Sequence, residues 1–317
     1  AKQGVLAVMW ESVRRLPQDL QLVRSLKLQW AYGVEQIVSR SKRQMQEAAR
    51  FAALCADAGC RLILLKGIGL SRYYPVPLQR ECGDIDILLP EGFEIGNEIA
   101  KSHGMTISGL DYKHNHIYSN GIMFENHRYL TSFKGKNDIR RLEKILQNAI
   151  KEGNFAPFGD AGFYALSPTA NALYITYHSF FHFLIEGITL RHLLDWALFV
   201  KAEQDTIDWI RFYSICDDLG FSRFANTLNA IAADVWGISL ANPGMSFDRC
   251  LLDRVLDDVL AQRRHVSGLP LYKRRPLLIC NMLLSRWKYR QLYGRSFLGE
   301  MMRSVSGVLF DRSPELE

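Results

Sequence analysis

A short apolar run carrying two carboxylates, Asp84–Leu89 (DIDILL), constrains this chain more than any other feature. Side chains alternate between the faces of a β-strand, so Asp84 and Asp86 share one face while Ile85 and Ile87 occupy the other. Like charges on one face of an apolar strand repel each other, and a divalent cation is the usual compensation. Paired carboxylates suit Mg²⁺, a hard ion that prefers oxygen ligands. The alternative is that the two aspartates form the solvated face of an edge strand.

A second buried strand is expected just before this run, at Leu62–Leu65, where four apolar residues follow one another. It leads into Lys66 and Gly67. The segment Gly67–Tyr74 is expected to be a short helix, and Pro75 ends it because proline cannot continue a helix. The sequence therefore predicts strand, glycine turn, short helix and carboxylate-bearing strand in that order.

A β-hairpin is predicted further along, where Asn120-Gly121 joins residues 111–119 to residues 122–128. Asn-Gly between alternating apolar residues is the strongest local hairpin signal. A two-residue loop fixes the register, with these expected pairs: Ser119 with Ile122, Tyr118 with Met123, Ile117 with Phe124, and His116 with Glu125.

This register puts a third carboxylate, Glu125, on one face of the hairpin, and the same face carries His114, His116, Tyr118 and His127. Glu125 is either a metal ligand or a structural partner of His116. The histidines are either ligands of a metal or phosphate, or hydrogen-bonded parts of the framework.

The remaining pattern is helical. Helices are expected at residues 18–28, 35–58, 91–102 and 138–151, and residues 153–162 are expected to form a loop. Later helices are expected at residues 167–184, 189–203, 207–219, 222–236, 247–264, 271–292 and 296–308. A strand-rich half followed by a helical half indicates an α+β fold.

Composition fits a globular chain of 317 residues, long enough for two domains, with 48% hydrophobic and 23% charged residues. No apolar run reaches the roughly 18 residues of a membrane-spanning helix, and no signal-peptide pattern is visible. The six cysteines are scattered without a CxxC motif, which fits reduced thiols in a cytoplasmic protein.

The net charge of +6 is concentrated near the C-terminus, because residues 261–303 hold ten Lys or Arg and one acid, Glu300. The basic segment 263–303 has three interpretations: a solvated helix face, an electrostatic site for an anionic acceptor, or a membrane-surface helix built on Leu283, Leu284 and Trp287.

The order of these elements resembles the nucleotidyltransferase fold of the polymerase-beta type. The motifs LKG, YYP, GDIDILLP, NGIMFENH and LRHLLDWALF, over roughly residues 60–200, are similar to the bacterial family of uncharacterised nucleotidyltransferases. The chain departs from the superfamily pattern at Ile68, where a serine usually follows the turn glycine. The resemblance implies an α+β fold with a mixed sheet, flanking helices and an all-helical C-terminal domain. It implies these domains: residues 1–58 as N-terminal helices packing on the catalytic domain, 59–155 as the catalytic domain, and 156–317 as the helical domain.

The resemblance also implies a function, the Mg²⁺- or Mn²⁺-dependent transfer of NMP from an NTP such as ATP to an acceptor hydroxyl or phosphate by a two-metal mechanism. The expected catalytic and metal-binding residues are Asp84, Asp86 and Glu125. The expected nucleotide-binding residues are Lys66, Gly67, Arg80 and Arg191. The acceptor would be a small molecule, a protein or RNA.

Several alternatives stay open. Arg191 either faces the nucleotide or pairs within its helix with Asp195. His178 and His182 have the spacing of zinc ligands, although packing explains them more simply. The protein could instead be a non-catalytic binding or regulatory module that uses the basic helical surface. A third reading is a helical nucleic-acid binder with a vestigial catalytic half.

Overall fold

The structure is a computed structural model. It describes residues 3–109, 111–133, 136–159, 161–240, 248–261, 270, 272, 276–277, 280 and 283–310, with side chains as far as residue 303. The chain forms two compact units: residues 1–129 with 149–167, and residues 130–148 with 168–317. Each unit is described by itself.

The first unit is built on a seven-stranded sheet in the order β3-β4-β5-β2-β1-β7-β6. Its strands are β1 (Leu62–Leu64), β2 (Ile85–Leu88), β3 (Thr106–Ser108), β4 (His114–Ser119), β5 (Ile122–His127), β6 (Phe155–Phe158) and β7 (Phe163–Leu166). The central strand β2 pairs antiparallel with β1 and parallel with β5. This mixed sheet confirms the predicted α+β class.

The β4–β5 hairpin has the predicted register. Ser119 pairs with Ile122 and His116 with Glu125, and the two pairs between them also match the expected ones. Asn120 and Gly121 both have positive φ, 49° and 75°. Two successive positive φ values are what a tight turn needs to match the twist of its strands, and Asn-Gly adopts them readily.

Residues 155–158, inside the stretch expected to form a loop, instead form β6, which pairs antiparallel with β7 in a second hairpin. The β7 strand also pairs parallel with β1, where Leu62 faces Phe163. Glycines and Pro157 gave this stretch its loop-like character. Proline is tolerated in β6 because β6 is the edge strand of the sheet. The predicted domain boundary between residues 155 and 156 falls inside β6.

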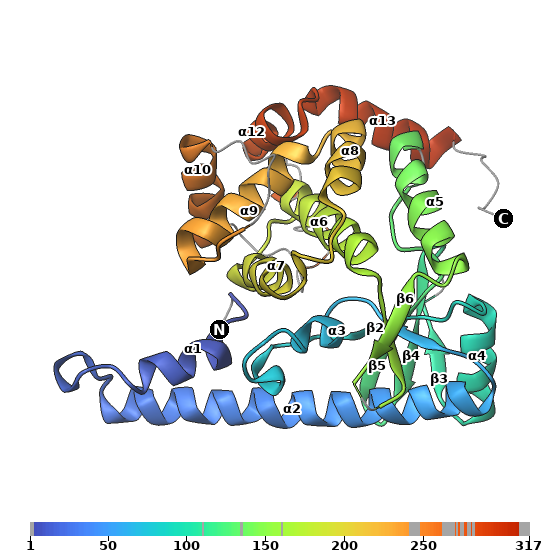
Figure 1. The fold of residues 1–317 in the computed structure, drawn as a ribbon, viewed down its shortest axis with the longest axis horizontal. Coiled ribbons are helices and arrows are strands. Elements are labelled where there is room, and N and C mark those ends of the chain that lie inside the picture. Colours follow the sequence, from blue (N-terminus) through green and yellow to red (C-terminus); the bar gives the residue numbers. More distant parts are fainter. Residues whose placement is uncertain are drawn as a thin grey trace. The chain divides into compact units, whose positions relative to one another are not determined.

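The helices of the first unit are α1 (Leu6–Val13), α2 (Arg24–Asp57), α3 (Ile68–Ser71) and α4 (Phe93–Ser102), with 3₁₀ turns at η1 (Gln18–Leu20) and η2 (Pro77–Gln79). The separate helix expected at residues 18–28 is wrong, because α2 begins at Arg24 and continues for 34 residues (Figure 1). It passes through Gly33, where an added Cβ would lie 3.4 Å from Leu6. Glycine therefore lets α1 pack closely against α2 at the point where the sequence suggested a break.

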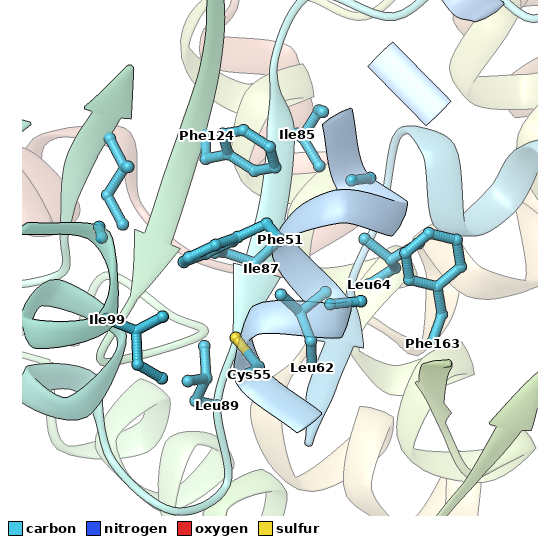
Figure 2. Close-up of a cluster of buried hydrophobic side chains, with 14 of the residues drawn as sticks. Phe51, Cys55, Leu62, Leu64, Ile85, Ile87, Leu89, Ile99, Phe124 and Phe163 are labelled. Carbon is cyan, nitrogen blue, oxygen red and sulfur yellow. The ribbon is translucent and has the colours of Figure 1, made fainter. Parts of the chain in front are cut away.

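The C-terminal half of α2 packs on the sheet. Phe51 and Cys55 of α2 contact a cluster that includes Ile85 and Ile87 of β2 and Phe124 of β5 (Figure 2). All five side chains are fully buried, and each large one contributes about 1.5–3 kcal/mol by leaving water. Because Ile85 and Ile87 face this core, strand alternation turns Asp86 to the opposite face of the sheet.

The second unit is all helix in its described residues. Its helices are α5 (Asn137–Lys151, whose last turn belongs to the first unit), α6 (Pro168–Ile185), α7 (Leu190–Glu203), α8 (Trp209–Leu219), α9 (Ser222–Trp236), α10 (Arg249–Leu260), α12 (Arg286–Lys288), a π-helical turn η3 (Tyr289–Tyr293) and α13 (Phe297–Phe310). Those expected between residues 167 and 264 are found, with ends shifted by up to four residues, and α13 matches the one expected at 296–308. The helix expected at 271–292 is described only in part: residues 272, 276–277, 280, 283–284 and 286–288 are helical, and residues 289–292 belong to η3.

The basic segment 263–303 is described only at residues 270, 272, 276–277, 280 and 283–303. Within the described part, Lys288 is 1% exposed, with its Nζ 2.7 Å from Asp258 Oδ1. Arg295 contacts Asp138 at 2.6 Å, and Arg303 contacts Glu300 at 3.2 Å. These three cations are therefore neutralised within the unit.

Two further expectations concern the whole chain. None of the described helices combines the length and apolar character needed to cross a membrane. All six cysteines are free thiols.

Candidate active site

The two neighbouring strands β2 and β5 bring the predicted carboxylates together. Asp86 on β2 is directly opposite Glu125 on β5 in a parallel pair, and neighbouring strands lie about 4.8 Å apart. Asp86 is 1% exposed. The interpretation of the aspartates as the solvated face of an edge strand is wrong, because β2 is the central strand and Asp86 is buried.

Lys66 lies beside Asp86 because β1 and β2 run antiparallel. The Leu65 N–H donates to the Asp86 carbonyl at 3.1 Å, which aligns the end of β1 with the carboxylate strand. The Lys66 Nζ lies 2.9 Å from Asp86 Oδ1, and its side chain keeps 21% exposure. This ammonium supplies part of the compensation that the paired aspartates require.

Gly67 is needed where it stands. Its φ is +57°, and an added Cβ would lie 2.8 Å from Cys82 Sγ and 3.8 Å from Asp86 Oδ2. Such a short contact cannot persist without a shift of the turn. The absence of a side chain therefore brings the backbone of this turn next to the carboxylate site.

Ile68, which stands where the superfamily usually has serine, has a packing role. It is 4% exposed and belongs to the same core cluster as Phe51 and Ile87. Gly69 follows it, and a Cβ there would lie 2.8 Å from the Leu64 carbonyl oxygen. The turn is thus fixed by apolar packing and a close backbone approach, without a hydroxyl at position 68.

His127 contacts the buried carboxylate of Asp86, a contact that no sequence pattern specified. Its Nε2 lies 3.0 Å from Asp86 Oδ1, and its Nδ1 lies 3.1 Å from the Tyr129 carbonyl oxygen. Both partners are acceptors, so both ring nitrogens donate and the imidazole is protonated. Burial alone would lower the pKa of His127, but hydrogen bonds to Asp86 and Glu125 outweigh burial and raise that pKa.

Glu125 joins the buried histidine to two outer ones. His127 Nε2 lies 3.4 Å from Glu125 Oε2, while His114 Nε2 and His116 Nε2 lie 3.8 and 3.9 Å from Oε1. Ligand atoms of His114, Glu125 and His127 all lie within 4.8 Å of one another. A metal ion bound there would displace the proton from His127 Nε2, because a protonated nitrogen has no lone pair for a metal. Burial lowers the pKa of His114, which favours the neutral imidazole that ligates metals.

The three carboxylates titrate differently because their surroundings differ. Burial and the neighbouring charge of Asp86 raise the pKa of Asp84 to about 6. Burial also opposes ionisation of Asp86, but Lys66 and His127 overcome it and lower the pKa of Asp86. At Glu125 the hydrogen bond from His127, helped by Lys66, likewise outweighs burial and lowers the pKa.

The site carries more negative than positive groups, which favours binding of a cation. Three carboxylates stand against two positive groups, Lys66 and protonated His127, and Asp84 carries the unrelieved repulsion. The oxygen donors suit Mg²⁺, and imidazole nitrogens beside them also suit Mn²⁺. The residues present therefore fit a divalent metal.

Arg80 and Arg191 are the two arginines predicted to bind the nucleotide. Arg80 is 5% exposed, and its Nη1 donates to the Glu81 carbonyl at 3.2 Å. Arg191 lies on α7 of the second unit, where its helix neighbour Asp195 is buried. The structure thus brings Lys66 and Gly67 to the carboxylates within one unit, while Arg191 belongs to the other unit. On α6, the rings of His178 and His182 lie 4.5 Å apart, and His182 contacts Glu186.

Comparison with known proteins defines the family. A family model described as "Uncharacterised nucleotidyltransferase" matches residues 1–237. The chain therefore belongs to this nucleotidyltransferase family, as its motifs predicted. A search of the curated proteins gave no match. Among solved structures, the chain is similar to one titled "tRNA-processing enzyme (apo form I)", with 12% identity, 85% of this chain and 98% of that chain covered, and a TM-score of 0.27.

Proposed function

We propose that this protein is a metal-dependent nucleotidyltransferase that moves NMP from an NTP to an acceptor hydroxyl or phosphate. The observation that carries the proposal is the set of carboxylates on and beside the neighbouring strands β2 and β5. Asp86 and Glu125 are directly opposite each other, and Asp84 precedes Asp86 on the same face and responds to the charge of both. Membership of a nucleotidyltransferase family supports the assignment of nucleotidyl transfer to these carboxylates.

Asp84, Asp86 and Glu125 would hold Mg²⁺ or Mn²⁺. Bound metal would supply positive charge for the attacking and leaving oxygens of phosphoryl transfer, as a two-metal mechanism requires. Glu125 stays ionised at neutral pH because its pKa is lowered. Its carboxylate can therefore favour loss of the proton from an acceptor hydroxyl.

Lys66 and Gly67 would receive the triphosphate. The Lys66 ammonium is partly exposed beside Asp86, so it can serve a phosphate oxygen and the carboxylate at once. Gly67 presents bare backbone next to the carboxylates, which lets a phosphate oxygen approach closely. Arg80 and Arg191 remain proposed phosphate ligands. The substitution Arg191→Gln, with the nucleotide dissociation constant as the measurement, tests whether Arg191 contributes to nucleotide binding.

Calorimetry with Mg²⁺ and a non-hydrolysable ATP analogue tests the proposal. Saturable binding is expected for the wild-type protein and is expected to disappear in the Asp84→Ala/Asp86→Ala double variant. Asp205→Asn, which changes one charge at an exposed position of the second unit, is the matched control and should bind normally. Equal binding by the wild-type protein and the double variant would show that the carboxylates do not hold the nucleotide's metal.

A second candidate function is a non-catalytic module that keeps the fold and binds a partner through its basic helices. It is favoured by the buried Ile68 in place of a turn hydroxyl and by the contacts of Lys66 and His127 with Asp86, which compensate the charge of that carboxylate. Absence of nucleotide binding at millimolar concentration in the same calorimetry would favour this module.

A further inference from the structure

A cavity of about 500 Å³ lies within the second unit, and none of its described lining residues is one of the three carboxylates. The described residues that line it come from α9, α10 and the π-helical turn η3, and they include Arg223, Asn226, Arg254 and Gln291. Small-molecule sites in proteins usually have volumes of about 300–1,000 Å³. The cavity is thus large enough for a metabolite rather than a single ion.

Gln291 positions two guanidinium groups at this cavity. Arg223 Nη1 donates to the Gln291 carbonyl at 3.3 Å, and Arg254 Nη1 donates to Gln291 Oε1 at 3.0 Å. The Arg254 guanidinium also stacks on Trp287, with its central carbon 4.3 Å from the ring centroid. One residue of a π-helical turn, a feature frequent at functional sites, therefore fixes both cations.

Both guanidiniums keep their charge uncompensated. Each donates to a neutral oxygen of Gln291, and no carboxylate among the described residues pairs with either. Other arginines of this unit differ: Arg249 contacts Asp234 at 2.7 Å, and Arg295 contacts Asp138 at 2.6 Å.

The acidic and amide groups that line the cavity also leave it suited to an anion. Asp248 is occupied as the N-cap of α10, where its Oδ1 accepts from the Leu251 N–H at 3.0 Å. The buried Oδ1 of Asn226 has no hydrogen-bond partner among the described residues. Asn226 lines the cavity, and its side-chain Nδ2 can donate an N–H to a bound oxygen.

We propose that this cavity binds a small phosphorylated or carboxylated metabolite, with its anionic group held between Arg223 and Arg254 and hydrogen-bonded to Asn226. Guanidinium groups bind phosphate and carboxylate oxygens through paired N–H donors, which explains why two fixed arginines suit such a group. None of the lining residues is a proposed metal- or nucleotide-binding residue, so this proposal does not rest on that function.

The cavity carries its own reporter, the exposed thiol of Cys250. Inorganic phosphate, glucose 6-phosphate and citrate are added separately to the full-length protein, and alkylation of Cys250 by iodoacetamide is followed by peptide mass spectrometry. Cys280, also exposed but not among the lining residues, is the internal control. At least one probe is expected to slow alkylation of Cys250 saturably and to leave Cys280 unchanged. The three probes distinguish a free phosphate, a phosphate ester and a carboxylate.

Two variants localise the effect. Arg254→Gln and the isosteric Asn226→Asp, which adds a negative charge, are each expected to raise the half-protecting concentration about tenfold or more, the loss of one charge-assisted contact. Arg211→Gln, at an exposed position of α8, is the charge-matched control and should behave as wild type. If a melting curve shows that Arg254→Gln does not fold, Asn226→Asp decides. Unchanged alkylation with all three probes, or equal weakening by Arg211→Gln, would overturn the proposal.

Discussion

Substituting Asp84 by asparagine is expected to stabilise the metal-free protein while abolishing nucleotidyl transfer. Burial and the charge of Asp86 raise the pKa of Asp84 from 3.8 to about 6. Each pH unit corresponds to about 1.4 kcal/mol, so ionised Asp84 costs the fold about 3 kcal/mol at neutral pH. The isosteric Asp84→Asn removes that charge, and we expect a gain of about 2–3 kcal/mol in the free energy of unfolding at pH 7.5.

The pH dependence follows from the same pKa. Between the unfolded and folded pKa values of Asp84, 3.8 and about 6, the folded state binds the extra proton. This group therefore lowers the stability of the wild-type protein as the pH rises through that window. The variant has no such loss. Its advantage should shrink by about 2 kcal/mol between pH 7.5 and pH 4.5.

The assay is urea denaturation of EDTA-treated protein at both pH values, followed by circular dichroism. Asp205→Asn makes the same charge change at an exposed position and should stay within about 0.5 kcal/mol of wild type. The reasoning is refuted if Asp84→Asn is less stable than wild type at pH 7.5, or if its advantage is the same at both pH values.

Three further predictions follow from single contacts. Millimolar Mg²⁺ should raise the melting temperature of the wild-type protein and not that of a variant lacking the carboxylates; equal shifts in differential scanning fluorimetry would contradict the metal site. Gly67→Ala should lower the free energy of unfolding by about 1–3 kcal/mol, since its Cβ would lie 2.8 Å from Cys82 Sγ. The control Gly83→Ala, whose Cβ would have nothing within 4 Å, should leave the free energy of unfolding from urea denaturation nearly unchanged. Lys288→Met should cost about 3–5 kcal/mol because it breaks the buried 2.7 Å ion pair with Asp258; a melting temperature unchanged from wild type would show that this pair is not needed.

Local signals in the sequence predicted the parts of the site that depend on local structure. The Asn120-Gly121 turn fixes the register that places Glu125 opposite His116, and strand alternation predicts that Asp84 and Asp86 share one face. Both rules act over a few residues, and both hold without knowledge of the rest of the fold.

What could not be predicted depends on pairing between distant segments. The parallel pairing of β2 with β5 brings His127 to Asp86, 41 residues away, and no sequence pattern specifies which strands become neighbours. The β6–β7 hairpin could not be predicted for the same reason, because β7 pairs with β1, which lies about 100 residues earlier. In addition, Pro157 is typical of a loop. Ile68 looked like a defect of the nucleotide turn until its burial gave it a packing role.

The most direct test of the proposed function is a transfer assay with each of the four α-³²P-labelled NTPs, Mg²⁺ or Mn²⁺, and host extract as the source of acceptor. The wild-type protein is expected to label an acceptor or itself with at least one NTP, and the folded Asp84→Ala/Asp86→Ala variant is expected to label nothing. Full labelling by that double variant would contradict the assignment of the site, and no labelling by the wild-type protein with any NTP would contradict nucleotidyl transfer itself.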